Sequence, residues 1–130
     1  MSRHWAALLL LAAGLGEPAL AAGSWVADAP AVRVAMVGRE AASEVLAPPA
    51  GMTAERRIAE VRWRFRVPPG ERVGARLCHP RGCVRLAGGR GTSQALAGMA
   101  AGEALRFHFE RLPGQGPVTV KGLQVIVNYR

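Results

Sequence analysis

The chain has 130 residues, with 17 Lys+Arg against 9 Asp+Glu for a formal net charge of +8, 2 cysteines and 5% aromatic residues. This length excludes more than one domain of ordinary size, and the few aromatic residues restrict the core that such a domain can bury. No apolar stretch after residue 21 approaches the roughly 20 residues that cross a bilayer, so we expect no membrane insertion of that part.

Residues 1–21 predict a cleaved export signal. A short cationic segment precedes the apolar run over residues 5–13, and helix-breaking residues then lead to Ala19-Leu20-Ala21, the small-x-small pattern that a signal peptidase accepts. A membrane anchor is the alternative, but the apolar run is about half of the roughly 20 residues that a bilayer core requires. Cleavage near Ala21 would leave a single domain over residues 22–130, which keeps the charge of +8 because the signal carries one basic and one acidic residue.

The clearest strand signal is an alternation of apolar and polar residues over residues 60–67. Its apolar members are Val61, Trp63, Phe65 and Val67. Successive side chains of a strand point to opposite faces, so these residues would face the core while the arginines between them face solvent.

Shorter alternations predict further strands, which cover residues 32–36, 105–110 and 118–129. Gly122 would allow a bend or bulge in the last of them. Only the alanine-rich residues 95–104 could form a turn of helix. Many short strands separated by Pro- and Gly-rich turns indicate an all-β domain, either a small antiparallel β-sandwich or a barrel-like fold.

Cys78 and Cys83 are expected to form a disulfide, which an exported protein can keep. The four residues between them are too many for the C-x-x-C motif of a thiol oxidoreductase. They fit a hairpin with a four-residue loop, which would place the cysteines opposite each other and expose a tip that includes His79 and Arg81. A zinc site that adds His79 and His108 is the alternative, although this spacing fits no standard site.

No arrangement of residues predicts catalysis. A Ser-His-Asp set can be assembled from Ser93, His108 and Asp28, but it lacks a nucleophile elbow, and His108 would lie on the outer side of its strand. The glycine-rich residues 88–91 lack the helix N-terminus and the lysine of a phosphate-binding loop, so we expect them to connect strands. The sequence therefore predicts no enzyme activity, no metal site and no cofactor.

Arginines form the candidate partner-binding face. Arg62, Arg64 and Arg66 share the solvent side of one strand. The hairpin register adds Arg76 and Arg85, which would oppose each other on the side that carries the disulfide.

Two interpretations of this face remain, because directly opposed like charges are unfavourable. Either acidic neighbours such as Glu60 and Glu110 interleave the arginines in a solvated surface, or a partner supplies the negative charge. An acidic protein or an anionic envelope glycan would fit such a partner. Nucleic acid would not, because it is an unlikely partner outside the cytoplasm, and because Trp63 and Phe65 point away from the arginines and cannot stack on bases.

Short blocks along the chain carry a resemblance to a known family. They are Gly23-Ser24-Trp25-Val26-Ala27, Leu46-Ala47-Pro48-Pro49-Ala50-Gly51, Val61-x-Trp63-Arg64, Leu77-Cys78-x4-Cys83-Val84-x-Leu86, Leu105-Arg106-Phe107 and Val127-Asn128-Tyr129-Arg130. In this order they resemble the flagellar protein FlhE family.

This resemblance implies a small, all-β, non-enzymatic protein of the periplasm that is tied to flagellar assembly and swarming. It further implies an accessory or chaperone-like factor of the flagellar type III export apparatus, which restrains secretion or proton leak. Proteins of the basal body or of the export apparatus would then be the partners. The family offers no catalytic motif, and only Cys78 and Cys83 carry over, as a disulfide.

Overall fold

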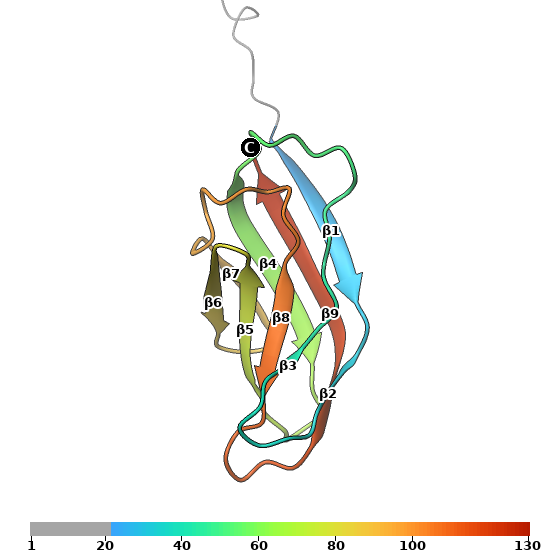
Figure 1. The fold of residues 1–130 in the computed structure, drawn as a ribbon. Coiled ribbons are helices and arrows are strands. Elements are labelled where there is room, and N and C mark those ends of the chain that lie inside the picture. Colours follow the sequence, from blue (N-terminus) through green and yellow to red (C-terminus); the bar gives the residue numbers. More distant parts are fainter. Residues whose placement is uncertain (1–21) are drawn as a thin grey trace, which may run out of the picture.

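The structure is a computed structural model that describes residues 22–130, so the expected export signal over residues 1–21 lies outside the described part. Two antiparallel β-sheets pack face to face along this part of the chain, as Figure 1 shows. None of the described residues forms a helix, so this part of the chain contains no helix that could span a membrane. The expected all-β sandwich is therefore confirmed.

The larger sheet has five strands, and β9 and β4 lie at its centre. Its order is β1 (Gly23–Ala29), β9 (Val118–Tyr129), β4 (Ile58–Arg66) and β7 (Arg90–Ser93). The fifth strand, β2 (Val32–Val34), pairs with the first three residues of β9. The smaller sheet has four strands in the order β3 (Ala41–Ala42), β8 (Arg106–Glu110), β5 (Gly74–His79) and β6 (Gly82–Leu86).

The alternation over residues 60–67 is confirmed in β4. Val61, Trp63 and Phe65 are buried between the sheets, and Phe65 makes edge-to-face contacts with Phe107 and Phe109 of β8, with ring centroids 6.0 and 5.2 Å apart. Such aromatic pairs add about 0.5 to 1.5 kcal/mol beyond the area that they bury. The inner face of β4 therefore joins the two sheets, and its other face is left to solvent.

Gly122 produces the expected bulge in β9. The buried residues are Val118 and Val120 before it but Leu123 and Val125 after it, so the inward face changes from even to odd positions. Gly122 has a φ of 65°, which favours glycine, and the pairing with β4 gains one residue between Arg64↔Gln124 and Arg66↔Lys121. The bulge keeps apolar side chains inside along the whole strand, and it places Lys121 on the outside opposite Arg66.

Two local expectations in the chain segments between strands were wrong. Residues 95–104 form turns rather than helix, and Gly98 there adopts a φ of 86° that interrupts helical geometry. Met36 is 58% exposed, because β2 ends at Val34.

The tip of the cysteine hairpin is also shorter and more buried than expected. His79 pairs with Gly82, so only Pro80 and Arg81 form the turn. His79 is 4% exposed, its Nδ1 accepts a hydrogen bond from the Arg81 backbone N–H at 3.0 Å, and its Nε2 lies 2.9 Å from the Ala100 carbonyl oxygen. Since Nδ1 accepts, Nε2 carries the hydrogen and donates it. His79 thereby fixes the hairpin to the turns that precede β8.

Candidate functional site

The five arginines predicted as one partner-binding face lie on two different sheets. Arg62, Arg64 and Arg66 are exposed on the outer face of the five-stranded sheet. Arg76 and Arg85 oppose each other across β5 and β6, on the outer face of the four-stranded sheet. Because the outer faces of a sandwich point away from each other, the five side chains do not form one surface. Their role in binding stays a prediction.

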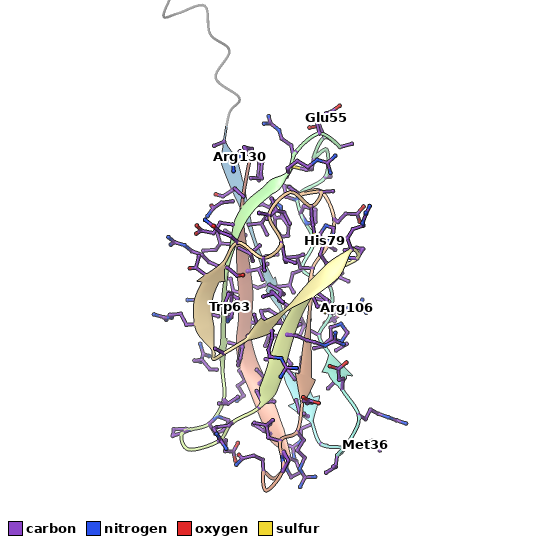
Figure 2. All side chains as sticks on the ribbon, turned by 90° about the vertical axis from the view of Figure 1, so that its left-hand side faces the viewer. Met36, Glu55, Trp63, His79, Arg106 and Arg130 are labelled. Atoms are coloured by element: carbon purple, nitrogen blue, oxygen red, sulfur yellow. A yellow bond between two sulfur atoms is a disulfide. The ribbon has the colours of Figure 1, made fainter. Side chains whose placement is uncertain are left out.

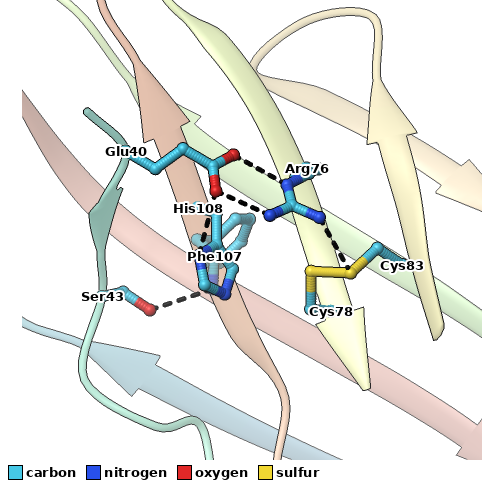
Figure 3. A network of polar contacts seen from close by, with 7 residues as sticks. All are labelled: Glu40, Ser43, Arg76, Cys78, Cys83, Phe107 and His108. Atoms are coloured by element: carbon cyan, nitrogen blue, oxygen red, sulfur yellow. Dashed lines mark hydrogen bonds and ion pairs between the residues drawn. A yellow bond between two sulfur atoms is a disulfide. The ribbon is translucent and has the colours of Figure 1, made fainter. Parts of the chain in front are cut away.

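On the four-stranded sheet, Arg76 is neutralised by Glu40, as Figure 3 shows. The Arg76 guanidinium donates two hydrogen bonds to the Glu40 carboxylate, from Nε at 2.8 Å and from Nη2 at 2.6 Å. Its Nη1 donates a third to Cys83 Sγ at 3.3 Å. We call this surface the compensated face and define it by Glu40, Arg76, His108 and the bridge between Cys78 and Cys83.

The disulfide is confirmed. Cys78 and Cys83 are directly paired across the hairpin, with their Cα atoms 4.0 Å apart and their sulfur atoms bonded. Since both sulfur atoms are used in this bond, they are not available as the zinc ligands of the alternative interpretation.

The surroundings on the compensated face lower the pKa values of Glu40 and His108 and raise the pKa of Arg76. Hydrogen bonds from Arg76 lower the pKa of Glu40, burial opposes this effect, and the positive charge of Arg76 adds to it. Burial lowers the pKa of His108, and the positive charge of Arg76 adds to this effect, while Glu40 opposes it. His108 Nδ1 lies 3.9 Å from Glu40 Oε1. The face thus favours an ionised Glu40 beside a neutral His108.

Sequence reasoning missed Glu40, because its position depends on a strand of only two residues. The backbone of Ser43 donates to the Phe107 carbonyl oxygen at 2.9 Å, and its Oγ accepts from the Phe107 N–H at 3.0 Å. These bonds fix the β3 segment beside β8 and bring Glu40 over Arg76. No local pattern around Glu40 indicates this pairing. Glu110, one of the two acidic neighbours expected among the arginines, attracts Arg76 more weakly than Glu40 does.

On the five-stranded sheet, no cation shares two hydrogen bonds with a carboxylate within the described residues. We call this surface the cationic face, and its members are Arg33, Arg62, Arg64, Arg66, Arg90 and Lys121. Arg64 opposes Arg90 in the pairing of β4 with β7, and Arg66 opposes Lys121 in the pairing of β4 with β9.

Within residues 22–130, the one ion pair on this face joins Arg62 to Glu60, with Nε 3.5 Å from Oε1. The expectation that Glu60 interleaves the arginines is therefore confirmed for Arg62 and for no other member in the described chain. Beside Arg64 and Arg90, the surface is hollowed by about 400 Å³.

Sequence reasoning missed Lys121, because in a regular strand this side chain would point inward. The bulge at Gly122 turns it outward instead.

The residues of the hypothetical Ser-His-Asp set are not brought together. Asp28 lies on β1 and accepts a hydrogen bond from Gln124 Nε2 at 2.9 Å. Ser93 ends β7 in the same sheet, where its Oγ accepts from the Ala95 N–H at 3.0 Å. His108 lies on the outer side of the other sheet. Residues 88–89 connect strands as expected, but Arg90 and Gly91 already belong to β7, where a Cβ at Gly91 would lie 2.4 Å from the Trp63 ring.

Comparisons with known proteins agree with the fold. Residues 31–130 match the family model described as flagellar protein FlhE. The chain is 37% identical over 121 residues to a flagellar protein FlhE of Yersinia enterocolitica, covering 86% of this chain and 84% of that protein. It is also 37% identical over 139 residues to the flagellar protein FlhE of Salmonella typhimurium strain LT2, covering 98% and 99% of the two chains.

A solved structure has the same architecture. The crystal structure of an FlhE superposes with a TM-score of 0.74 at 32% sequence identity, over 84% of this chain and 97% of the other. The match in sequence extends across both sheets and includes the cysteine hairpin. The chain therefore belongs to the FlhE family of flagellar proteins.

Proposed function

We propose that this protein acts outside the cytoplasm as a non-enzymatic flagellar accessory factor. In this role it binds a protein of the basal body or of the export apparatus and restrains flagellar secretion, in a chaperone-like manner that also limits proton leak. Membership of the FlhE family supports the flagellar part of this proposal. The disulfide between Cys78 and Cys83 supports export, because such bonds persist in oxidising compartments.

The observation that carries the binding role is the cationic face. Arg64 opposes Arg90 without a carboxylate within ion-pair distance in the described chain. Directly opposed like charges weaken a sheet, so an arrangement of this kind is unfavourable for the isolated fold. An acidic partner surface removes this repulsion on binding and also speeds the encounter of the two proteins. The cationic face is therefore the docking surface that we propose for a flagellar partner.

The rest of the fold suits a docking role. The core joins the two sheets through the contacts of Phe65 with Phe107 and Phe109, and the disulfide closes the hairpin at the edge of the smaller sheet. A surface held on rigid strands binds with little loss of conformational freedom. We propose that the protein restrains export by occupying its partner rather than by chemistry.

A deletion strain complemented with variants tests this proposal. We expect the deletion to change flagellar secretion, swarming or cytoplasmic pH, and wild-type protein to restore them. A variant that combines Arg62→Gln, Arg64→Gln and Arg90→Gln should be exported and folded but should fail to restore them. Arg85→Gln, which removes an exposed charge from the opposite sheet, is the control and should restore them.

Two results would contradict the proposal at different points. A deletion strain equal to wild type in secretion, swarming and cytoplasmic pH would remove the flagellar role. Full complementation by the triple arginine variant would leave the flagellar role intact but would show that the cationic face is not needed for it. Crosslinking in the cell from a photoreactive residue at position 64 would identify the partner.

A second candidate function rests on the same uncompensated charges. The protein would then be a general envelope module whose arginines hold an anionic glycan or an acidic protein outside the flagellum. Its binding should weaken as salt rises, since exposed charges are screened within about 10 Å at 0.1 M salt. Replacement of Arg62, Arg64 and Arg66 by glutamine should abolish this binding. Normal flagellar function in the deletion strain would favour this candidate over the first.

A further inference from the structure

A cleft of about 740 Å³ lies at the end of the sandwich where β4 ends and β2 pairs with β9. This is the lower end in Figure 1, and Figure 2 shows Met36 at this end and Arg130 at the other. The hollow beside Arg64 has about 400 Å³ and different lining residues. The volume of the cleft falls within the range of about 300 to 1,000 Å³ that is typical of ligand sites.

Three cations line this cleft. Arg33 is held in place because its Nη1 donates a hydrogen bond to Thr119 Oγ1 at 3.0 Å. Arg66 and Lys121 oppose each other across β4 and β9. The Arg66 guanidinium lies over Gly122, where a Cβ would be 2.8 Å from its Nη1. The bulge therefore provides both the outward turn of Lys121 and the space that Arg66 occupies.

The remaining lining is largely apolar. The lining includes Pro68 and Pro69 of the turn after β4 and Pro117, which precedes β9. Proline rings offer an apolar surface without a backbone N–H donor. Glu71 is the one carboxylate among the lining residues, so positive charge exceeds negative charge there by two. The cleft thus suits a ligand that combines negative charge with aliphatic groups.

A peptide satisfies these requirements better than a sugar or a nucleotide. No aromatic side chain is among the lining residues, so nothing there can stack on a sugar ring or a base. Carboxylates of a peptide can accept charge-assisted hydrogen bonds from the two arginines, and its aliphatic side chains can pack on the prolines.

We propose that this cleft binds an extended acidic segment of a partner protein. One carboxylate of the segment meets Arg33, a second lies between Arg66 and Lys121, and an aliphatic side chain packs on Pro68, Pro69 and Pro117. Because Arg33, Arg66 and Lys121 are members of the cationic face, this site rests on the proposed docking role and specifies its ligand and its location. Binding of a peptide to the purified protein tests it separately from the flagellar role.

Fluorescence anisotropy of the purified protein with a labelled short peptide rich in glutamate and leucine tests this proposal. The variant Arg33→Gln/Lys121→Gln should bind roughly tenfold more weakly, because it removes two charged donors. Arg85→Gln/Arg106→Gln is the matched control, since it removes the same charge from exposed positions on the other sheet. Its affinity should stay within about twofold of wild type.

Peptide variants complete the test. Replacing the glutamates by glutamine should abolish binding, and replacing the leucines by serine should weaken it. The variant Arg33→Glu/Lys121→Glu should bind a lysine-rich version of the peptide, a result that loss of structure cannot produce. Equal weakening in the cleft variant and in the control variant would overturn the proposal. Competition by polygalacturonate as strong as that by the acidic peptide would also overturn it, in favour of a glycan.

Discussion

The two outer faces of the sandwich both carry an arginine that opposes another cation across a strand pair. They differ in whether a carboxylate neutralises that arginine. On the compensated face, Arg76 opposes Arg85 but shares two hydrogen bonds with Glu40. On the cationic face, Arg64 opposes Arg90 without a carboxylate partner in the described chain. An arginine on an outward strand position therefore has a bidentate carboxylate partner at Arg76, whereas Arg64 has no carboxylate partner within residues 22–130.

This difference shows which part of the net charge of +8 can attract an acidic partner. In a bidentate pair such as that between Arg76 and Glu40, the carboxylate neutralises the guanidinium, so the pair attracts an acidic partner only weakly. Unpaired cations on a rigid sheet keep their long-range field, which attracts acidic surfaces. Net charge alone does not distinguish the two faces, whereas the position of Glu40 does.

The largest expected effect is a difference in stability between substitutions on the inner and the outer side of β4. Trp63 lies between Arg62 and Arg64 in β4 but points into the core, where its Nε1 donates to the Gly88 carbonyl oxygen at 2.9 Å. Trp63→Ala should lower the free energy of unfolding by about 3 to 5 kcal/mol, because it leaves a large cavity. Arg64→Gln should change it by less than about 0.5 kcal/mol. Urea unfolding measures both, and similar losses in the two variants would contradict the assignment of faces.

The second effect concerns the bridge on the compensated face. Changing Cys78 and Cys83 to serine together should cost about 2 kcal/mol, since a short closed loop restricts the unfolded chain only modestly. Urea unfolding of the variant and of chemically reduced wild type should give the same loss. Mass spectrometry that finds two free thiols in exported wild-type protein would contradict the bridge itself.

The third effect is a pH dependence that only the compensated face should show. The pKa of His108 is lowered in the folded protein by burial and by the charge of Arg76, so the unfolded chain takes up the proton first. Stability should therefore fall as the pH drops below about 6.5, the usual pKa of histidine, and His108→Gln should remove this part of the loss. Glu40, whose pKa is also lowered, stabilises the fold above its usual pKa and loses this effect at lower pH.

Urea unfolding between pH 8 and pH 5 measures the effect of His108 separately from that of Glu40, because carboxylates of usual pKa are still ionised above about pH 5. Arg64→Gln serves as the control and should keep the wild-type pH profile. A His108→Gln variant with an unchanged profile would show that the pKa of His108 is not lowered in the folded protein.

The parts of the fold that local patterns encode could be predicted. Trp63 and its neighbours alternate regularly over residues 60–67, and the spacing of Cys78 and Cys83 fixed the register of one hairpin correctly. In contrast, β1 was not predicted, because only Trp25 marks its inward face strongly.

The candidate sites depended on pairings that no local pattern carries. Glu40 and Arg76 are 36 residues apart in sequence, and they meet because β3 and β5 both pair with β8. Lys121 faces outward only because Gly122 inserts one residue into the register of β9. Sequence reasoning could identify the exposed arginines but not which of them are neutralised, since neutralisation is a property of the tertiary fold.

The smallest effect tests the comparison most directly, with one charge change on each face. Glu40→Gln leaves Arg76 opposite Arg85 without its carboxylate and should lower stability slightly. Arg64→Gln relieves the repulsion with Arg90 and should leave stability unchanged or raise it. In urea unfolding at low salt, Glu40→Gln should therefore be less stable than wild type, and Arg64→Gln should not be. At about 1 M salt, where charges are screened within about 3 Å, the difference should shrink.

A double change separates the pair from its surroundings. Because Glu40→Gln and Arg76→Gln remove the same interaction, their combination should cost less than the sum of the single changes. The combination of Arg64→Gln with Arg76→Gln joins residues on different faces and should be additive. Additivity in the first pair would mean that Arg76 is not stabilised by Glu40, and the two faces would then differ in geometry but not in energy.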